Sequence, residues 1–542
     1  MNSPKYGTRY VNVLVNTDLF CFKKGVDTCT QLTMLKKTCA ETSGLTRPRA
    51  RQTVNKSRRR TSVRRTNWHE KNGTRCGKDV EQKLINEQIL VTNLVTWCIE
   101  RGFSGSGLSV RPTVNRKGRG LEATRVIEKG ECVLSVPLRR GIVDEERGHP
   151  EEVLALIKNA PWGVRLACRL LQELKKRELS EYRAYLELLP VDVETSPLHY
   201  SEDLIAQICY PQAQNEIREM KTAVNKWFDL LEKDDFNVAI AGATREEFTK
   251  AVAVVHSRTY GMSSGETGEG YFRALLPLAD LLNHGGEQFL DENRSSTAIV
   301  NTETVAWSEI LVDDDNVNDD NDDEQEAASI MFTAQKTLEP GEEATMSYGD
   351  RSNDHFLIYY GFIPKNNPHD DVIIFENFDS AMIWHAMCFD EFWRREDIQA
   401  RELNAVRAFK ETSLALENTT DAMLTKSEPR MKVLSDGRVD ARLLAAFAAL
   451  YAGDEELSRK NAADDTESLN AARKDVALRC EQLLQTMQKA SGKNEAEEIF
   501  ESSLRTKKTY ENETERVISL FRKNKMFILR DCAQKMKLPL DV

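Results

Sequence analysis

The 542-residue sequence lacks several features that would place it in familiar classes of protein. It has eleven cysteines but no Cys-x-x-Cys pair, which argues against a structural zinc site. Their scattered positions suggest no disulfide framework and fit a reducing compartment. No apolar run reaches the roughly 18 residues that a transmembrane helix needs. A basic excess is also missing, because the formal net charge of −11 argues against a general nucleic-acid binder.

What remains is the composition of an ordinary soluble protein, with 40% hydrophobic and 30% charged residues. The length exceeds what a single hydrophobic core usually holds, so two or three domains are expected.

Residues 1–78 differ from the rest of the chain. They contain 18 Lys or Arg but only 4 Asp or Glu, are rich in Ser, Thr and Asn, and show no helical or strand period. A basic, hydroxylated segment with few acids is typical of an organelle transit peptide. Two other interpretations stay open: a nuclear signal at Arg58–Arg60 and Arg64–Arg65, or a disordered tail.

The remaining chain alternates between helical and strand patterns. Helical spacing of apolar residues predicts a helix over 81–101 and a largely helical stretch over 150–255. Between them, residues 117–137 predict two strands joined by a Lys-Gly turn. From residue 372 onward the pattern is again helical, and Asp440 is placed to cap one of these helices.

An acidic run interrupts the second half of the chain. Residues 313–326 are almost wholly Asp, Asn, Glu and Gln, which cannot bury apolar surface and predict a solvated, disordered loop. The run contains no glycine, whereas a calcium-binding EF-hand loop needs one at its sixth position. We therefore exclude a calcium loop.

Two tyrosines follow a predicted strand near the middle of the chain. Residues 344–346 come after the turn pair Pro340-Gly341, and Tyr348 stands at the strand end. Ser352 or Asn353 can cap a short helix that carries Tyr360 and is closed by a glycine. The pattern places one phenol at a strand end and a second phenol one short helix later.

A polar pair ends an apolar run about 65 residues upstream. Leu275 to Leu282 is apolar except for Asp280, and it stops at Asn283-His284. Buried polar groups need partners, so this is an unusual position for an amide and an imidazole. Taken alone, the pair indicates no more than a loop held in place by side-chain hydrogen bonds.

Together and in this order, Asn283-His284, Ser347-Tyr348-Gly349-Asp350 and Tyr360-Gly361-Phe362 resemble the SET domain of protein methyltransferases. These motifs are similar to those of the plastid branch, the Rubisco large-subunit lysine methyltransferases. The resemblance covers roughly residues 85–540. It implies an α+β fold, with a β-rich SET core at 80–365 followed by an all-α substrate-binding domain at 372–542. A helical insert at about 145–255 would split the SET core, and the acidic loop would lie within it.

The resemblance also implies roles for individual residues. Tyr348 becomes the catalytic phenol, and the cofactor is S-adenosylmethionine. Cofactor contacts are implied for Lys117, Gly118, Arg119, Ser257, Arg258, Asn283, His284 and Tyr348. Substrate contacts are implied for Arg258, Asp280, Tyr360 and Phe362. Methyl transfer to an amine is an in-line displacement that depends mainly on positioning, so no metal is expected.

The implied function is protein-lysine N-methylation. Relatives that methylate histidine depart from the Tyr-Gly-Phe motif at the Tyr360 position. The presence of Tyr360 therefore favours lysine as the methyl acceptor. Many histone-directed SET enzymes carry cysteine clusters, and their absence favours a non-histone protein such as Rubisco large subunit or plastid aldolase. We expect a chloroplast monomer with a protein substrate and no nucleic-acid or membrane partner; cytosol and nucleus are the alternative locations. The rival functions are histidine methylation and a catalytically dead scaffold that binds a protein.

Overall fold

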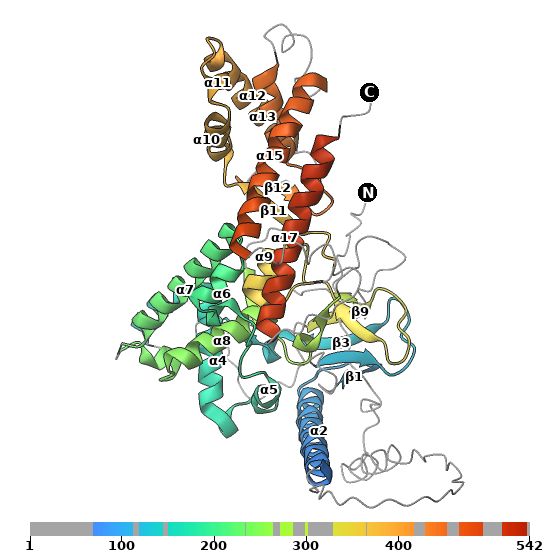
Figure 1. Cartoon of the computed structure of the whole chain (residues 1–542). Coiled ribbons are helices and arrows are strands. Elements are labelled where there is room, and N and C mark those ends of the chain that lie inside the picture. Colours follow the sequence, from blue (N-terminus) through green and yellow to red (C-terminus); the bar gives the residue numbers. More distant parts are fainter. Residues whose placement is uncertain are drawn as a thin grey trace, which may run out of the picture.

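The computed structural model describes most of the chain from residue 69 onward. The described residues are 69–111, 119–144, 150–233, 235–263, 271–285, 299–301, 329–364, 366–416, 429–452, 466–491 and 512–538. In Figure 1 the strands β1, β3 and β9 lie in the lower part of the molecule, and the long C-terminal helices α15 and α17 extend upward from them. None of the helices in the described ranges combines the length and apolar character that crossing a bilayer requires.

The central sheet joins short strands that lie far apart in the chain. Its strand order is β1-β2-β10-β8-β9-β3, and β7 pairs with β10 beside this path. The strands are β1 Leu108–Arg111, β2 Gly120–Ala123, β3 Cys132–Pro137, β7 Asn283–His284, β8 Ile299–Asn301, β9 Ser329–Ala334 and β10 Glu343–Met346. β10 is antiparallel to β2 but parallel to β7 and β8. It is therefore the strand at which the N-terminal and central segments meet.

A second, three-stranded sheet lies beside a helical region. Its order is β4-β6-β5, from Ile142–Val143, Tyr271–Leu275 and Thr259–Ser263. The α-helices between β4 and β5 are α3 Glu151–Lys158, α4 Trp162–Lys176, α5 Arg183–Leu188, α6 Glu202–Gln207, α7 Pro211–Leu231 and α8 Arg245–Arg258. α8 starts with a reciprocal capping box between Thr244 and Glu247, which satisfies its free N–H groups. Because α8 runs directly into β5, Arg258 is fixed at the junction of two rigid elements.

The residues after 370 form a second unit around their own hydrophobic core, which also takes in residues of α6 and α7. Its elements are β11 Asp371–Phe375, α10 Phe378–Cys388, α11 Asp390–Trp393, α12 Ile398–Leu416, β12 Met431–Leu434, α13 Ala441–Tyr451, α15 Thr466–Ser491 and α17 Glu513–Lys537. Asp440 caps α13 by accepting the backbone N–H of Arg442 at 3.0 Å, as expected.

The expectation of an all-α C-terminal domain needs one correction. β11 and β12 form an antiparallel two-stranded sheet within it. All five residues of β11 are buried, and such a short buried run has no period that separates a strand from a helix.

Two further expectations about local structure were wrong. The predicted helix at 81–101 is α2, and it begins at His69, inside the segment for which no helix was expected. Once a helix has formed, each added residue gains a hydrogen bond, so a helix can extend beyond the residues whose apolar spacing predicts it. Of the two strands predicted within 117–137, the first is β2, which ends at Ala123. Residues 126–131 form a turn and not a strand, with a single bridge from Ile127 to Leu338. The acidic run at 313–326 lies outside the described residues.

A fully buried lysine connects the two units. Lys525 of α17 is 0% exposed and donates to the Asp354 carboxylate, to Asp370 at 2.7 Å and to the backbone carbonyl of Asp371. Asp370 also accepts the backbone and side-chain N–H groups of Asn353 at 2.9 and 2.8 Å. Asn353 and Asp354 belong to the short helix α9, Asn353–His355, which directly precedes the turn that carries Tyr360. We call this network the junction cluster.

Candidate active site

The two polar motifs noted in the sequence lie side by side in the sheet. Asn283 and His284 of β7 pair in parallel with Thr345 and Met346 of β10. His284 Nδ1 accepts the backbone N–H of Tyr348 at 3.2 Å, which fixes the chain just beyond the end of β10. Burial lowers the pKa of His284 to about 4, so the imidazole is neutral at pH 7.

Asn283 connects the paired strands β7 and β10, which we call the Asn-His ladder, to the residues at the start of β2. Its Nδ2 donates to the backbone carbonyl of Arg119 at 3.1 Å and to Glu343 Oε1 at 2.8 Å. A Cβ on Gly120 would lie 2.9 Å from Arg111 Nη2, Asn283 Nδ2 and Glu343 Oε1, so a larger residue here would displace the ends of these side chains. The Arg119 side chain points elsewhere, to Glu87 and the Leu188 carbonyl, and only its backbone faces Asn283.

The Tyr348 hydroxyl has a fixed orientation. It donates to the backbone carbonyl of Leu282 at 2.6 Å. Burial, with a smaller contribution from Tyr360, raises the pKa of the Tyr348 phenol well above its usual value. The phenol therefore stays protonated, and since its own proton is committed to Leu282, its oxygen lone pairs remain available as acceptors.

Tyr360 is held by the short helical segment that the sequence predicted. Ser352 precedes α9, a π-helical turn spans Phe356–Tyr360, and Gly361 closes it in the left-handed region at φ 70°. The Tyr348 and Tyr360 ring centroids lie 5.0 Å apart. The Phe362 and His284 ring centroids lie 6.1 Å apart. Phe362 therefore supports the two tyrosine rings on the side of the Asn-His ladder.

Arg258 and Asp280 form an ion pair in which only one of the two carboxylate oxygens has a hydrogen-bond partner among the described residues. Asp280 Oδ2 accepts Arg258 Nη1 at 3.1 Å and the Tyr185 hydroxyl at 3.0 Å. Asp280 Oδ1 is buried and has no hydrogen-bond partner among the described residues. Burial raises the pKa of the Asp280 carboxyl, while Arg258 and Tyr185 act in the opposite direction. We call this group the site cluster.

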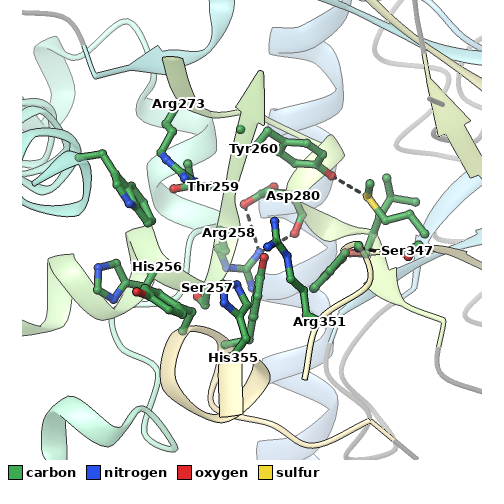
Figure 2. Close-up of a pocket in the computed structure, with 18 residues that line it drawn as sticks. His256, Ser257, Arg258, Thr259, Tyr260, Arg273, Asp280, Ser347, Arg351 and His355 are labelled. Atoms are coloured by element: carbon green, nitrogen blue, oxygen red, sulfur yellow. Dashed lines mark hydrogen bonds and ion pairs between the residues drawn. The ribbon is translucent and has the colours of Figure 1, made fainter. Parts of the chain in front are cut away.

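Some of these residues line a pocket of about 360 Å³. Of the predicted site residues, Ser257, Arg258, Asp280, Tyr348 and Tyr360 line it. Figure 2 labels the first three of these. Phe362, Arg119, Asn283 and His284 are not among its lining residues. Lys117 and Gly118 lie outside the described residues.

Sequence reasoning missed several side chains in the pocket. Tyr260 projects from β5, and its hydroxyl donates to the Ala279 carbonyl at 2.7 Å and lies 3.2 Å from Met346 Sδ. Trp162, His256, Arg273 and Arg351 also line the pocket. Tyr260 stands two residues after Arg258 and could have been noticed on that ground, whereas the others come from separate elements with no shared pattern.

Comparison with known proteins agrees with this geometry. Residues 118–349 match the SET domain family. The chain therefore contains a SET domain. A solved SET domain of LSMT, bound to lysine and AdoHcy, covers 83% of this chain and 91% of its own at a TM-score of 0.54 and 15% identity. Rubisco LSMT bound to AdoMet aligns over the same shares at a TM-score of 0.51 and 15% identity. The fold is that of the Rubisco large-subunit methyltransferase type.

Three curated relatives illustrate the sequence similarity. The chloroplastic [fructose-bisphosphate aldolase]-lysine N-methyltransferase of Arabidopsis thaliana is 31% identical over 36% of this chain and 39% of its own length. The chloroplastic Rubisco large subunit N-methyltransferase of Nicotiana tabacum is 28% identical over 51% of each chain. The actin-histidine N-methyltransferase of Gallus gallus is 27% identical over 52% of this chain and 44% of its own. The aligned region thus spans about two fifths to one half of these relatives.

Proposed function

We propose that the protein is an S-adenosylmethionine-dependent protein-lysine N-methyltransferase that acts on a non-histone protein. The observation that carries this proposal is the fixed phenol of Tyr348. Its hydroxyl proton is bound by the Leu282 carbonyl, and its ring stands between the Asn-His ladder and the pocket. A neutral oxygen acceptor in that position suits an incoming amine.

The residues present fit the proposed cofactor. Arg258 offers guanidinium donors for a carboxylate, and the buried Asp280 Oδ1, which has no partner in the described part of the chain, can accept from an ammonium group. S-adenosylmethionine, when bound, supplies an electrophilic methyl group. Asn283, His284, Arg258 and the backbone at Arg119 are the groups that would hold it.

The chain's own residues prepare the acceptor. Lysine has a reference pKa of about 10.4, so holding it neutral near pH 8 costs about 3 kcal/mol at 1.36 per pKa unit. Aromatic walls from Tyr348, Tyr360 and Tyr260 disfavour a charged amine by desolvation. Tyr348 accepts a hydrogen bond from the amine and so directs the nitrogen lone pair. Because the pKa of Tyr348 is raised, it orients the amine and does not remove its proton.

Lysine is preferred to histidine for one structural reason. Tyr360, the position at which the sequence motif favours lysine, lines the pocket and packs on Tyr348 with ring centroids 5.0 Å apart. Relatives named for aldolase-lysine and for actin-histidine methylation are similar to this chain to comparable degrees. Identifying the modified residue therefore decides between the two acceptors.

The decisive experiment uses labelled S-adenosylmethionine. The full chain is incubated with soluble extract, and the labelled protein is analysed by mass spectrometry, with the Tyr348→Phe variant in parallel. Methyl-lysine produced by the wild type and not by the variant supports the proposal. Methyl-histidine would replace it with the alternative activity. Cofactor binding without any methylated product would point to the protein-binding scaffold.

We further propose a plastid location and a plastid substrate. Two relatives are named as chloroplastic enzymes acting on Rubisco large subunit and on aldolase. The basic, hydroxylated composition of residues 1–78 suits import. A fluorescent fusion of residues 1–78 tests this. Uptake by chloroplasts supports it, while cytosolic or nuclear fluorescence contradicts it and removes Rubisco and plastid aldolase as candidates.

A further inference from the structure

We propose that a second pocket, of about 330 Å³, is a docking site for a segment of the protein substrate that carries aliphatic side chains and a carboxylate. This segment is separate from the one that presents the acceptor lysine. The inference rests on the proposed function, because it names a further part of the substrate that the same enzyme would recognise.

The second pocket is built mainly from aliphatic side chains. Its walls come from the second half of α4, from α8, from the end of α5 and from residues 240–243. Leu171 and Val254 are buried there, whereas Leu174 and Val191 are 43% and 85% exposed. Exposed aliphatic side chains beside an apolar hollow are typical of a surface that a partner covers. The second pocket therefore suits the aliphatic side chains of a bound segment.

The charge on the second pocket is unbalanced. Lys175 and Arg177 are exposed residues that line it, and neither has an ion-pair partner in the part of the chain that the structure describes. A third lining cation, Lys250, is paired with Glu246 at 2.6 Å. Glu247, the one acid among the described lining residues, serves in the capping box of α8. Two uncompensated cations beside an aliphatic hollow favour a ligand that combines aliphatic groups with a carboxylate.

The backbone at Arg177 is strained. Its φ and ψ are 51° and −117°, a combination that glycine adopts readily and that residues with a Cβ avoid. Residues held in such conformations are concentrated at ligand-binding sites. The Arg177 side chain makes no hydrogen bond or ion pair with another described residue, so the fold itself gains no such contact from an arginine at this position. A bound carboxylate explains why an arginine stands where glycine would be easier to accommodate.

The second pocket shares two helices with the pocket of Tyr348, which we call the catalytic pocket. α4 and α8 pack against each other (Figure 1), and the start of α4 meets the end of α8, where the Trp162 and His256 ring centroids lie 5.2 Å apart. Those two rings line the catalytic pocket, whereas residues within 170–175 and 247–254 line the second pocket.

This arrangement allows one substrate to occupy both pockets. On α4, the second pocket begins eight positions after Trp162, which corresponds to about 12 Å along the helix axis at 1.5 Å per residue. An extended protein segment of about four residues spans that distance. A docking segment a few residues from the acceptor lysine, or on a neighbouring surface of a folded substrate, can therefore reach the second pocket.

A lysine-free peptide tests the docking site directly. The probe is a fluorescein-labelled peptide with two leucines and two glutamates in a glycine–serine background, made with the leucines two, three or four positions apart. Counterparts replace the glutamates by glutamine or the leucines by serine. Fluorescence anisotropy measures binding to the full-length wild type, Val191→Asp, Lys175→Gln and Arg177→Gln. Leu179→Asp and Lys226→Gln are matched controls, because both residues are exposed and neither lines either pocket.

We expect the wild type and both controls to bind at least one probe, and to bind its glutamine and serine counterparts more weakly. Val191→Asp should weaken binding about 10-fold, because it places a carboxylate beside the apolar and anionic groups of the ligand. Lys175→Gln and Arg177→Gln should each weaken it about 2–5-fold, the effect of one exposed ion pair. Arg177→Gly should also weaken binding but raise the midpoint of chemical denaturation, because glycine relieves the backbone strain.

A methylation arm separates docking from catalysis. On a short lysine peptide that has no docking segment, the three docking variants should keep the wild-type kcat/KM. On soluble extract, the same variants should transfer less label from S-adenosylmethionine to the protein substrate than the wild type and the controls do. Adding the lysine-free probe should reduce wild-type labelling of the extract protein but not of the short peptide.

Three outcomes would overturn the inference. The first is the absence of saturable binding of any probe to the wild type. The second is binding that survives unchanged in Val191→Asp and in both cation variants. The third is equal binding of the glutamine and serine counterparts, which would indicate non-specific adsorption. Failure to methylate any peptide or extract protein would speak against the proposed function itself, and it is distinguishable because probe binding is measured without methyl transfer.

Discussion

The site cluster and the junction cluster both bury charge, but they use it differently. In the junction cluster, Lys525 donates to three oxygens, and Asp370 receives four hydrogen bonds, from Lys525, Asn353 and the N–H of Asp371. In the site cluster, Asp280 uses one oxygen on Arg258 and Tyr185 and leaves the other without a partner among the described residues. A buried network with every bond made fixes a structure, whereas one with an unused bond is ready for a ligand.

Removing the charge at the centre of the junction cluster should have the largest effect. Lys525→Met leaves buried carboxylates uncompensated, which typically costs about 3–5 kcal/mol of unfolding free energy. Chemical denaturation measures the loss, and Lys474→Met, at an exposed position on α15, serves as the control. A loss below about 1 kcal/mol would show that the junction cluster does not hold the two units together.

The catalytic phenol should come next. Tyr348→Phe removes the oxygen that accepts from the amine but keeps the ring, so we expect kcat to fall about 100-fold, or ~2.7 kcal/mol, with little change in cofactor affinity. Tyr182→Phe is the matched control, because its hydroxyl donates to the Gly141 carbonyl at 3.3 Å, away from the pocket. Turnover near the wild-type level in Tyr348→Phe would contradict the assigned role.

Asp280→Asn tests whether the site cluster is the weaker structural element. It removes the charge but keeps an amide oxygen that can accept from Arg258 and Tyr185, so the two hydrogen bonds are weakened and not lost. We expect the loss in unfolding free energy to be smaller than for Lys525→Met and to be accompanied by weaker cofactor or substrate binding. A loss equal to that of Lys525→Met with unchanged binding would erase the distinction between the two clusters.

The neutral His284 gives a pH prediction. Its pKa of about 4 lies below the usual value of about 6.5, so the unfolded chain binds more protons between these values. The contribution of His284 to stability is therefore complete above pH 6.5 and is lost as the pH falls through 4. The rate should rise from pH 7 to 9 as the acceptor lysine deprotonates, with no inflection near 6.5.

The variant His284→Gln separates a structural role from a basic one. If His284 orders the Tyr348 backbone, the variant should bind the cofactor more weakly and keep the shape of the pH–rate curve. An inflection near pH 6.5 that disappears in His284→Gln, with cofactor affinity intact, would instead identify a general base.

The smallest effect is expected outside both clusters. Deleting the acidic run 313–326 should change the unfolding free energy by no more than about 1 kcal/mol, because closure entropy depends only logarithmically on loop length. Thermal and chemical denaturation would reveal any larger effect. Loss of cofactor binding in this deletion would mean that the run contributes to the site.

The sequence predicted the inner part of the site because its signals are local. A phenol at a strand end, a glycine in the left-handed region at 361 and a polar pair closing an apolar run can each be recognised within a few residues. The junction cluster could not be predicted, since Lys525 meets partners 155 and 171 positions away and resembles any helical lysine in the sequence. That Arg273 and Arg351 line one pocket likewise could not be predicted, because they belong to separate elements that only the fold brings together.

The parallel pairing of β7 with β10 also determines when the pocket can appear during folding. The Tyr348 N–H and its His284 acceptor are 64 positions apart, so this ladder closes a long loop, whereas the surrounding helices depend on local contacts that form faster. A partly folded species that contains only the helices has neither the fixed phenol nor the neutral imidazole. A ligand that needs both binds the native state alone, and at 100 times its dissociation constant it would stabilise the whole chain by about 2.7 kcal/mol.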